Sequence, residues 1–213
     1  MPVAAKICGL MTTEAVKAAV EGGAAMCGFV FFPPSPRSLS VEEAAGLTGL
    51  VPEGVTPVAL TADADDILLR AIIEEAGVGM LQLHGHETPE QTARISDKFG
   101  LAVMKALPIA SADDVVAAHA YEGVCDRLMF DAKPPEGATR PGGNALAFDW
   151  ELLSGRDWAV PWTLAGGLTA ETVSEAVRIS GARMVDVSSG VEDAPGVKNT
   201  AKIRAFLDAV KAL

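Results

Sequence analysis

The chain has 213 residues, of which 49% are hydrophobic and 21% are charged, and its formal net charge at pH 7 is −11. A chain of this length can build a substantial hydrophobic core as one large domain or two small ones. The acidic balance argues against a nucleic-acid partner, because non-specific binding to nucleic acid relies on basic surface. It leaves open a small anionic substrate, since backbone N–H groups at helix N-termini can hold a phosphate without any lysine.

The distribution of apolar residues and cysteines narrows the class of protein further. No apolar run reaches the roughly 18 residues of a membrane span, and the first residues lack the basic patch and apolar core of a signal peptide. We therefore expect a cytoplasmic protein without a membrane partner. Cys8, Cys27 and Cys125 lie in separate apolar stretches without metal-ligand spacing, so we predict neither a disulfide framework nor a zinc site.

Short apolar segments alternate with helical patterns along the chain. In chain order, we expect strands at residues 3–9, 25–32, 55–61, 79–83, 101–107, 127–130, 161–165 and 184–187. The helical patterns cover residues 12–21, 41–50, 63–76, 88–99, 111–120, 148–153, 169–180 and 198–211. Residues 132–147 contain too many prolines and glycines for a helix or a strand and are expected to form a long loop.

This alternation of eight strands with helices predicts parallel strands joined by crossover helices, which is an α/β fold. In a chain of this length, eight units favour closure into a single (β/α)8 barrel, the TIM barrel. An open, doubly wound sheet is the alternative. We expect residues 1–213 to form one barrel domain that carries the active site.

In such barrels the active site lies at the carboxyl ends of the strands. The candidate residues at these ends are reactive or suited to anions: Cys8, Arg37, His84, Asp131, Gly166, Gly167, Ser188, Ser189 and Gly190. The glycine-containing turns after the last two strands are typical of a phosphate site, because glycine lets backbone amides approach an anion closely. Two ordinary glycine turns are the alternative.

Each reactive side chain also has a purely structural interpretation. Cys8 could act as a base or nucleophile through its thiolate, or it could be a small buried hydrophobe, as we expect for Cys27 and Cys125. Asp131 could be a turn or cap residue. Arg37 could be a solvated loop arginine, or its planar fork could bind a carboxylate.

The three histidines do not form a metal-binding pattern. His84 follows a predicted strand and could merely satisfy a loop carbonyl, whereas His86 and His119 are expected at the surface. We therefore predict no metal site.

Six motifs occur in order along the chain, at predicted strand ends and in the long loop. They are Lys6-Ile7-Cys8-Gly9, Gly28-Phe29 with Ser35-Pro36-Arg37, Gln82-Leu83-His84-Gly85, Gly142-Gly143 with Phe148-Asp149-Trp150, Leu164-Ala165-Gly166-Gly167-Leu168, and Asp186-Val187-Ser188-Ser189-Gly190-Val191-Glu192. In these motifs the chain resembles the phosphoribosylanthranilate isomerases of tryptophan biosynthesis over essentially its whole length.

The resemblance implies an Amadori rearrangement without a metal or organic cofactor, in which N-(5-phosphoribosyl)anthranilate becomes 1-(2-carboxyphenylamino)-1-deoxyribulose 5-phosphate. By position, Asp131 matches the general acid that protonates the ribose ring oxygen and opens the ring to a Schiff base. Cys8 matches the general base that takes the proton from C2 of the sugar, and the resulting enolamine tautomerises to the ketone. We expect Asp131 to be buried so that it keeps its proton, and the pKa of Cys8 to need only a modest downward shift.

The resemblance also implies how the two anionic ends of the substrate are held. Arg37 corresponds to the residue that holds the anthranilate carboxylate, and Gly167 with the amides of residues 188–190 corresponds to the phosphate site. The same motifs supply three further residues that we expect to contact the substrate: His84, Gly166 and Asp186.

Two positions depart from the family pattern. Ala145 stands where a glycine is usual, and if that position needs a positive φ, alanine would cost about 1 kcal/mol. Asn199 stands where aspartate is usual, but asparagine also caps a helix N-terminus, so we expect little effect.

Two alternatives belong to other functional classes. One is another sugar-phosphate isomerase or epimerase, although an epimerase would want metal ligands at several strand ends. The other is a catalytically silent phosphate-binding barrel, although binding alone requires neither Cys8 nor Asp131. As partners we expect a small-molecule substrate and, at most, a second copy of the chain, in a monomer or a homodimer.

Overall fold

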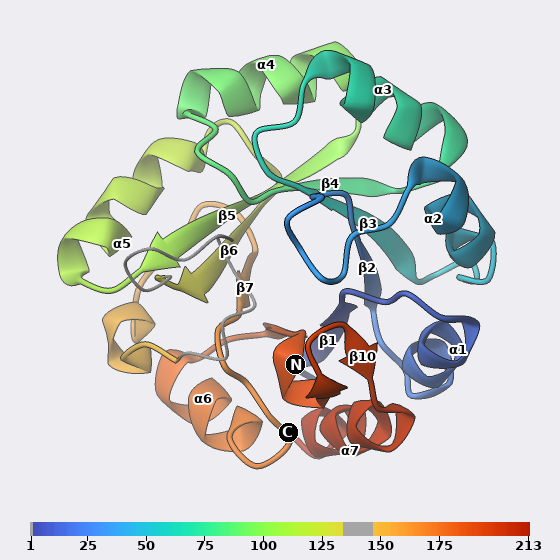
Figure 1. The fold of residues 1–213 in the computed structure, drawn as a ribbon. Helices are drawn as coiled ribbons and strands as arrows, with labels where there is room; N and C mark the ends of the chain where they lie inside the picture. Colours follow the sequence, from blue (N-terminus) through green and yellow to red (C-terminus); the bar gives the residue numbers. More distant parts are fainter. Residues whose placement is uncertain (1, 134–146) are drawn as a thin grey trace.

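A computed structural model describes residues 2–133 and 147–213 of the chain. Eight parallel strands close into a barrel in sequence order, and the last strand pairs with the first (Figure 1). The strands are β1 Ala4–Cys8, β2 Met26–Val30, β3 Thr56–Thr61, β4 Met80–Leu83, β5 Ala102–Ile109, β6 Arg127–Ala132, β7 Trp162–Leu164 and β8 Met184–Val187. The predicted closed barrel is confirmed, and the open sheet is excluded.

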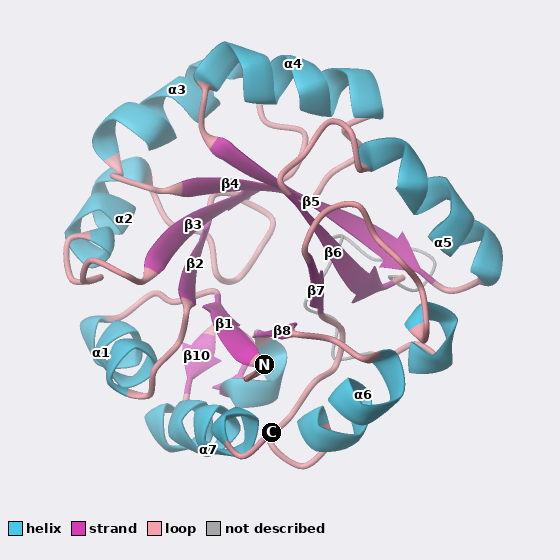
Figure 2. Ribbon diagram, turned by 180° about the vertical axis from the view of Figure 1, so that it is seen from behind, coloured by secondary structure: helices cyan, strands magenta, loops and turns pink. Residues whose placement is uncertain are grey.

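Helices surround the barrel on its outside (Figure 2). They are α1 Thr13–Glu21, α2 Val41–Thr48, α3 Asp66–Glu75, α4 Pro89–Phe99, α5 Ala112–Ala118, α6 Val173–Ser180 and α7 Thr200–Lys211, with 3-10 turns η1 His119–Tyr121, η2 Trp150–Leu153 and η3 Ser189–Val191. Side-chain oxygens cap the starts of several helices, as at Ser40, where Glu43 completes a capping box. Within the described part of the chain, none of the helices has the length and hydropathy to cross a bilayer.

Several boundaries differ from the sequence-based prediction. Strand β6 runs on to Ala132, so that Asp131 lies within the strand and not after it. The helix expected at 169–180 starts only at Val173, and the one expected at 148–153 is the single 3-10 turn η2. The loop expected at 132–147, with the glycine pair and Ala145, falls largely outside the described residues.

A short hairpin after β8 was not predicted. Strand β9 Glu192–Ala194 pairs antiparallel with β10 Val197–Lys198, and Gly196, with φ +85°, makes the turn between them. The final helix therefore begins at Thr200 instead of residue 198. The hairpin is missed from sequence because its strands are too short and polar to show an alternating apolar pattern.

The interior of the barrel changes from apolar to polar along the strand direction. Five methionines fill much of its apolar part: Met26, Met80, Met104, Met129 and Met184. Side chains alternate along a strand, so the residue two positions further on faces inward as well. Two residues after an inward methionine, strands β4, β6 and β8 place Gln82, Asp131 and Asp186. The polar end of the interior is thus the carboxyl end of the strands.

The hydrogen bonds at the start of α7 allow a test of the prediction that Asn199 caps this helix. Asn199 Oδ1 accepts hydrogen bonds from the amides of Ala201 and Lys202, at 2.8 and 3.0 Å, and Nδ2 donates to Asp193. We expect Asn199→Ala to lower the free energy of unfolding by about 1 kcal/mol, because two helix amides lose their acceptor. Urea unfolding measures this change. Asn199→Ser, which keeps an acceptor but loses the contact with Asp193, should recover most of it; equal losses in both variants would contradict the capping explanation.

Candidate active site

Cys8 lies at the carboxyl end of β1 with 4% of its surface exposed. Lys6, two residues earlier on the same face of the strand, has no exposed surface. Its ammonium lies 2.7 Å from Asp186 Oδ1 on the neighbouring strand β8 and interacts electrostatically with the Cys8 side chain. Burial alone would lower the pKa of Lys6, but the adjacent carboxylate and thiol raise it, so this buried amine is charged.

The electrostatic environment of the Cys8 thiol contains opposing influences. Burial raises its pKa, Lys6 lowers it, Asp186 raises it and Lys198 lowers it, and the pKa in the absence of substrate lies above its ordinary value. The expected modest downward shift is therefore not found in this structure. Burial also raises the pKa of Cys27 to about 12 and that of Cys125 to about 11. These two thiols are buried and free, as predicted for inert core residues.

Asp131 on β6 faces the carboxyl end of the barrel strands, which we call the mouth, and is 7% exposed. Its Oδ1 accepts a hydrogen bond from the Ala132 amide at 2.8 Å, and its Oδ2 lies 3.4 Å from His84 Nε2. The other ring nitrogen of His84 lies 3.2 Å from Gln82 Nε2, which can only donate. Nδ1 of His84 therefore faces Gln82, and Nε2 is the ring nitrogen that faces Asp131. The His84 side chain thus faces the side chain of the candidate acid, Asp131, and not a loop carbonyl.

Arg37 is a buried residue and not a solvated loop arginine, since only 4% of it is exposed. Its Nε and Nη2 donate to the two carboxylate oxygens of Glu192, each at 2.7 Å. Lys198 on β10 adds a second cation, with Nζ 2.7 Å from Glu192 Oε1. Burial tends to raise the pKa of Glu192, but the two cations outweigh this and hold it below its ordinary value. Arg37 was predicted from the sequence but its network was not, because the unpredicted hairpin supplies both Glu192 and Lys198.

Glycine brings the loops after β1, β2 and β8 together. Gly9 follows Cys8 with φ +76°, and a Cβ at this position would lie 2.5 Å from Arg37 Cδ and 3.3 Å from Ser188 Oγ. Any larger residue would push Arg37 away from the rim. Ser188 in turn accepts hydrogen bonds from Lys198 Nζ through its carbonyl, at 2.9 Å, and through its hydroxyl, at 3.3 Å.

The two predicted phosphate loops lie against each other. Gly166 and Gly167 both adopt positive φ, +91° and +63°. Gly190 lies so close to the Leu168 carbonyl oxygen that no Cβ would fit between them. A Cβ on Gly166 would lie 3.2 Å from Asp131 Oδ1, so the first loop also borders the candidate acid. The structure therefore brings the predicted anion loops and Asp131 together at one part of the rim.

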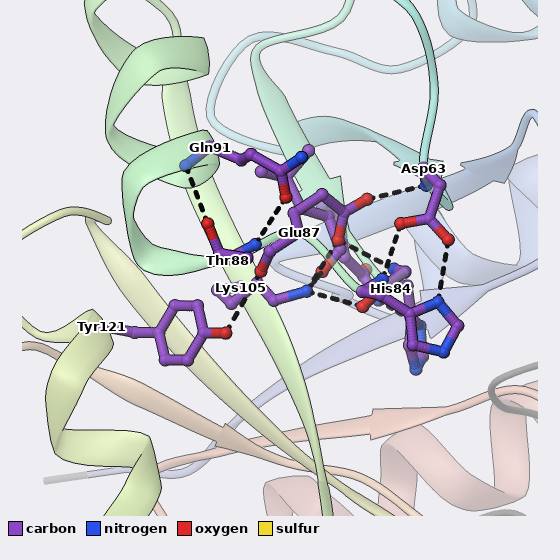
Figure 3. Close-up of polar contacts among 11 residues, drawn as sticks. Asp63, His84, Glu87, Thr88, Gln91, Lys105 and Tyr121 are labelled. Carbon is purple, nitrogen blue, oxygen red and sulfur yellow. Dashed lines mark hydrogen bonds and ion pairs between the residues drawn. The ribbon is translucent and has the colours of Figure 1, made fainter.

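A second buried lysine network fixes the turn after β4 (Figure 3). Lys105 on β5 donates to Glu87 Oε2 at 2.7 Å and to the Gly85 carbonyl at 2.9 Å. Glu87 Oε1 accepts from the Asp63 amide at 2.8 Å, and the Glu87 carbonyl accepts from the Tyr121 hydroxyl. Lys105 lies between two inward-facing residues and so points to the outside of the barrel. This network, which was not predicted from the sequence, holds the turn that carries His84.

Glu192 should contribute to stability in a pH-dependent way. A carboxylate whose pKa is lowered in the folded state stabilises the protein above its unfolded pKa of about 4.3, and this contribution is lost as the pH falls through the folded pKa. We expect Glu192→Gln to lower the free energy of unfolding at pH 7 by about 3 kcal/mol, because two buried cations lose their counter-charge.

Urea unfolding at several pH values between neutral and about pH 3 tests this expectation. The difference between the wild type and Glu192→Gln should shrink as the pH falls below about 4. Glu53→Gln, at an exposed position, is the control and should leave the profile unchanged. A difference that stays constant over the whole range would contradict the assigned role of the charge.

Comparisons with known proteins point to one family. The family model described as N-(5'-phosphoribosyl)anthranilate (PRA) isomerase matches residues 5–209. The N-(5'-phosphoribosyl)anthranilate isomerase of Paramagnetospirillum magneticum is 54% identical over 211 residues, which cover 99% of this chain and 98% of that protein. The enzyme of the same name from Rhodospirillum centenum is 51% identical over 214 residues, and the match covers 100% of both chains.

Solved structures show the same relationship. The phosphoribosyl anthranilate isomerase of Thermotoga maritima superposes with a TM-score of 0.89 at 32% identity, over 99% of this chain and 100% of that one. A phosphoribosyl anthranilate isomerase in complex with reduced 1-(o-carboxyphenylamino)-1-deoxyribulose 5-phosphate gives a TM-score of 0.86 at 31% identity, with the same coverage. Since the family model and the relatives cover nearly the whole chain, the chain belongs to the N-(5'-phosphoribosyl)anthranilate isomerase family.

Proposed function

We propose that this chain, as an isomerase of that family, converts N-(5-phosphoribosyl)anthranilate to 1-(2-carboxyphenylamino)-1-deoxyribulose 5-phosphate in tryptophan biosynthesis, with Asp131 as the general acid and Cys8 as the general base. Residues 1–213 act as one catalytic barrel in the cytoplasm. The observation that carries the proposal is that one carboxyl group and one thiol face the same mouth from separate strands, β6 and β1. Between these strands in the barrel lie the two glycine loops that suit a phosphate.

The first step is the opening of the ribose ring. Asp131 gives its proton to the ring oxygen while the bond from that oxygen to C1 breaks, and the anthranilate nitrogen supplies the electrons that form the Schiff base. The carboxylate that remains on Asp131 faces His84 Nε2, which lies 3.4 Å from Oδ2. His84 thereby stabilises the charge that develops on the acid.

The second step is the removal of the proton from C2. The Cys8 thiolate takes this proton, and the electron pair of the C–H bond moves toward C1 to give the enolamine. Loss of the proton on the C2 hydroxyl and protonation of C1 then give the ketone. The net change is an internal oxidation of C2 and reduction of C1, which requires no external oxidant.

The substrate has an anion at each end, and each end meets a suitable surface. The turn at Gly166 and Gly167, with the amides of residues 188–190, faces the phosphate. Arginine has five N–H donors, and Glu192 engages Nε and Nη2 of Arg37, so Nη1 supplies the contact to the anthranilate carboxylate. Held at both ends, the reacting carbons lie between acid and base.

The oligomeric state is proposed more broadly. The Thermotoga maritima relative is described as a dimeric enzyme from which monomers have been generated. For this chain we propose a monomer or a homodimer with a complete site in each barrel.

An assay with phosphoribosylanthranilate, followed by the loss of its fluorescence, tests the assignment of acid and base. We expect Cys8→Ser and Asp131→Asn each to lower kcat by about 10²–10⁴-fold, since each removes one proton-transfer group. Cys27→Ser, at a buried thiol outside the mouth, is the control and should retain kcat. An inactive wild type would instead favour a silent phosphate-binding barrel or a related sugar-phosphate enzyme, and full activity in both variants would exclude the mechanism.

Arg37→Lys tests the carboxylate contact separately. Lysine keeps the charge but loses the planar fork, so we expect KM to rise about tenfold, the equivalent of about 1.4 kcal/mol, with little change in kcat. Inhibition by inorganic phosphate should stay unchanged, because the proposed phosphate contacts are backbone amides and do not include the Arg37 side chain. A parallel loss of phosphate inhibition would place Arg37 at the wrong end of the substrate.

A further inference from the structure

Lys6 is a fully buried lysine whose position the mechanism above does not use. A buried ammonium is costly unless charged or polar partners surround it. Lys6 has two such partners, the Asp186 carboxylate at 2.7 Å and the Cys8 thiol. The carboxylate satisfies the charge of the amine, so the contact with the thiol needs an explanation of its own.

The neighbouring strand leaves room for this contact. Gly28 on β2 pairs with Cys8 across the sheet, and a Cβ built on it would lie 3.0 Å from both Cys8 Sγ and Lys6 Nζ. Any side chain at this position would displace one of the two groups. The ammonium and the sulfur therefore both lie against β2 where it presents only backbone.

We propose that Lys6 is a positioning residue that stabilises the thiolate form of Cys8 and so prepares it to accept a proton from carbon. The inference rests on the proposed role of Cys8 as the base. A thiolate is the reactive form of cysteine, and an adjacent cation is one of the few ways to favour it inside a protein. Lys6 acts through Cys8 and need not touch the substrate.

The charged groups that face Cys8 come from three elements of the barrel mouth. Lys6 precedes it on β1, Asp186 lies on β8, and Lys198 projects from β10, which lies near β1 in both views (Figures 1 and 2). The two lysines favour the thiolate, while Asp186 opposes it and also holds Lys6 in place. The balance predicts opposite effects on the thiolate for the loss of Lys6 and the loss of Asp186. A purely structural ion pair predicts no effect on the thiolate from either loss.

Titration of the Cys8 thiolate in the substrate-free protein tests the proposal. The thiolate is followed by its ultraviolet absorbance against a Cys8→Ser baseline, and pH-dependent alkylation of Cys8, read by peptide mass spectrometry, assigns the signal. Lys6→Met should raise the titration midpoint by about one pH unit. At any pH below the midpoint, the variant should then contain about tenfold less thiolate than the wild type. Asp186→Asn should lower the midpoint.

The double variant Lys6→Met/Asp186→Asn covers the case in which Lys6→Met fails to fold with an unpaired buried carboxylate. Its midpoint should lie above that of Asp186→Asn, a comparison in which Lys6 is the only difference. Lys105→Met, which breaks a buried lysine pair outside the barrel, is the matched control and should leave the midpoint unchanged.

The proposal is overturned if Lys6→Met and the double variant titrate like their parents, or if Asp186→Asn raises the midpoint. The titration uses no substrate, so this result is independent of the isomerase assay. Retained activity in Cys8→Ser would overturn the proposed base and leave the measured effect of Lys6 on the thiol intact.

Discussion

The ion pair between Lys6 and Asp186 joins the first strand of the barrel to the last. The two residues lie directly opposite each other in the β1–β8 pairing that closes the sheet. Such a buried pair contributes little net stability compared with well-packed apolar residues, but the loss of one partner leaves an uncompensated charge, at a cost of about 3–5 kcal/mol. When the barrel closes correctly, this pair therefore also places a cation beneath the mouth.

The mouth gathers buried cations, although the chain as a whole is acidic. Three cationic side chains, Lys6, Arg37 and Lys198, pair there with the carboxylates of Asp186 and Glu192, near the Asp131 carboxyl group, whereas the whole chain has a net charge of −11. A field of this overall sign repels an anionic substrate at long range, so recognition of a phosphate and a carboxylate depends on contacts within the site. Buried cations and backbone amides suit this task because salt screens them less than exposed charges. An acidic exterior and a mouth that holds buried cations are therefore compatible.

Sequence reasoning predicted the parts of the site that follow from strand order. Once the strands are parallel and closed, Cys8 and Asp131 must face one end of the barrel, and no tertiary detail is needed. The ion pairs of the site could not be predicted in this way. Glu192 and Arg37 are separated by 155 positions, and the hairpin that carries Glu192 has no apolar pattern. The inward orientation of Lys6 follows from alternation along β1, but its partner depends on the register with β8, which the sequence does not display.

The steric constraints and the electrostatics of the site depend on each other. Gly28 leaves the space in which Lys6 meets Cys8, and Gly9 leaves the space in which Arg37 crosses the loop after β1. A charge acts strongly on a neighbour only at short range and away from water, so a displacement of about 1 Å at either glycine would weaken the interaction as well as the packing. A methyl group at Gly28 would therefore press on both the ammonium and the sulfur without changing any charge. The space left by Gly28 on β2 and by Gly9 after β1 is therefore as necessary for the chemistry as the charged groups that fill it.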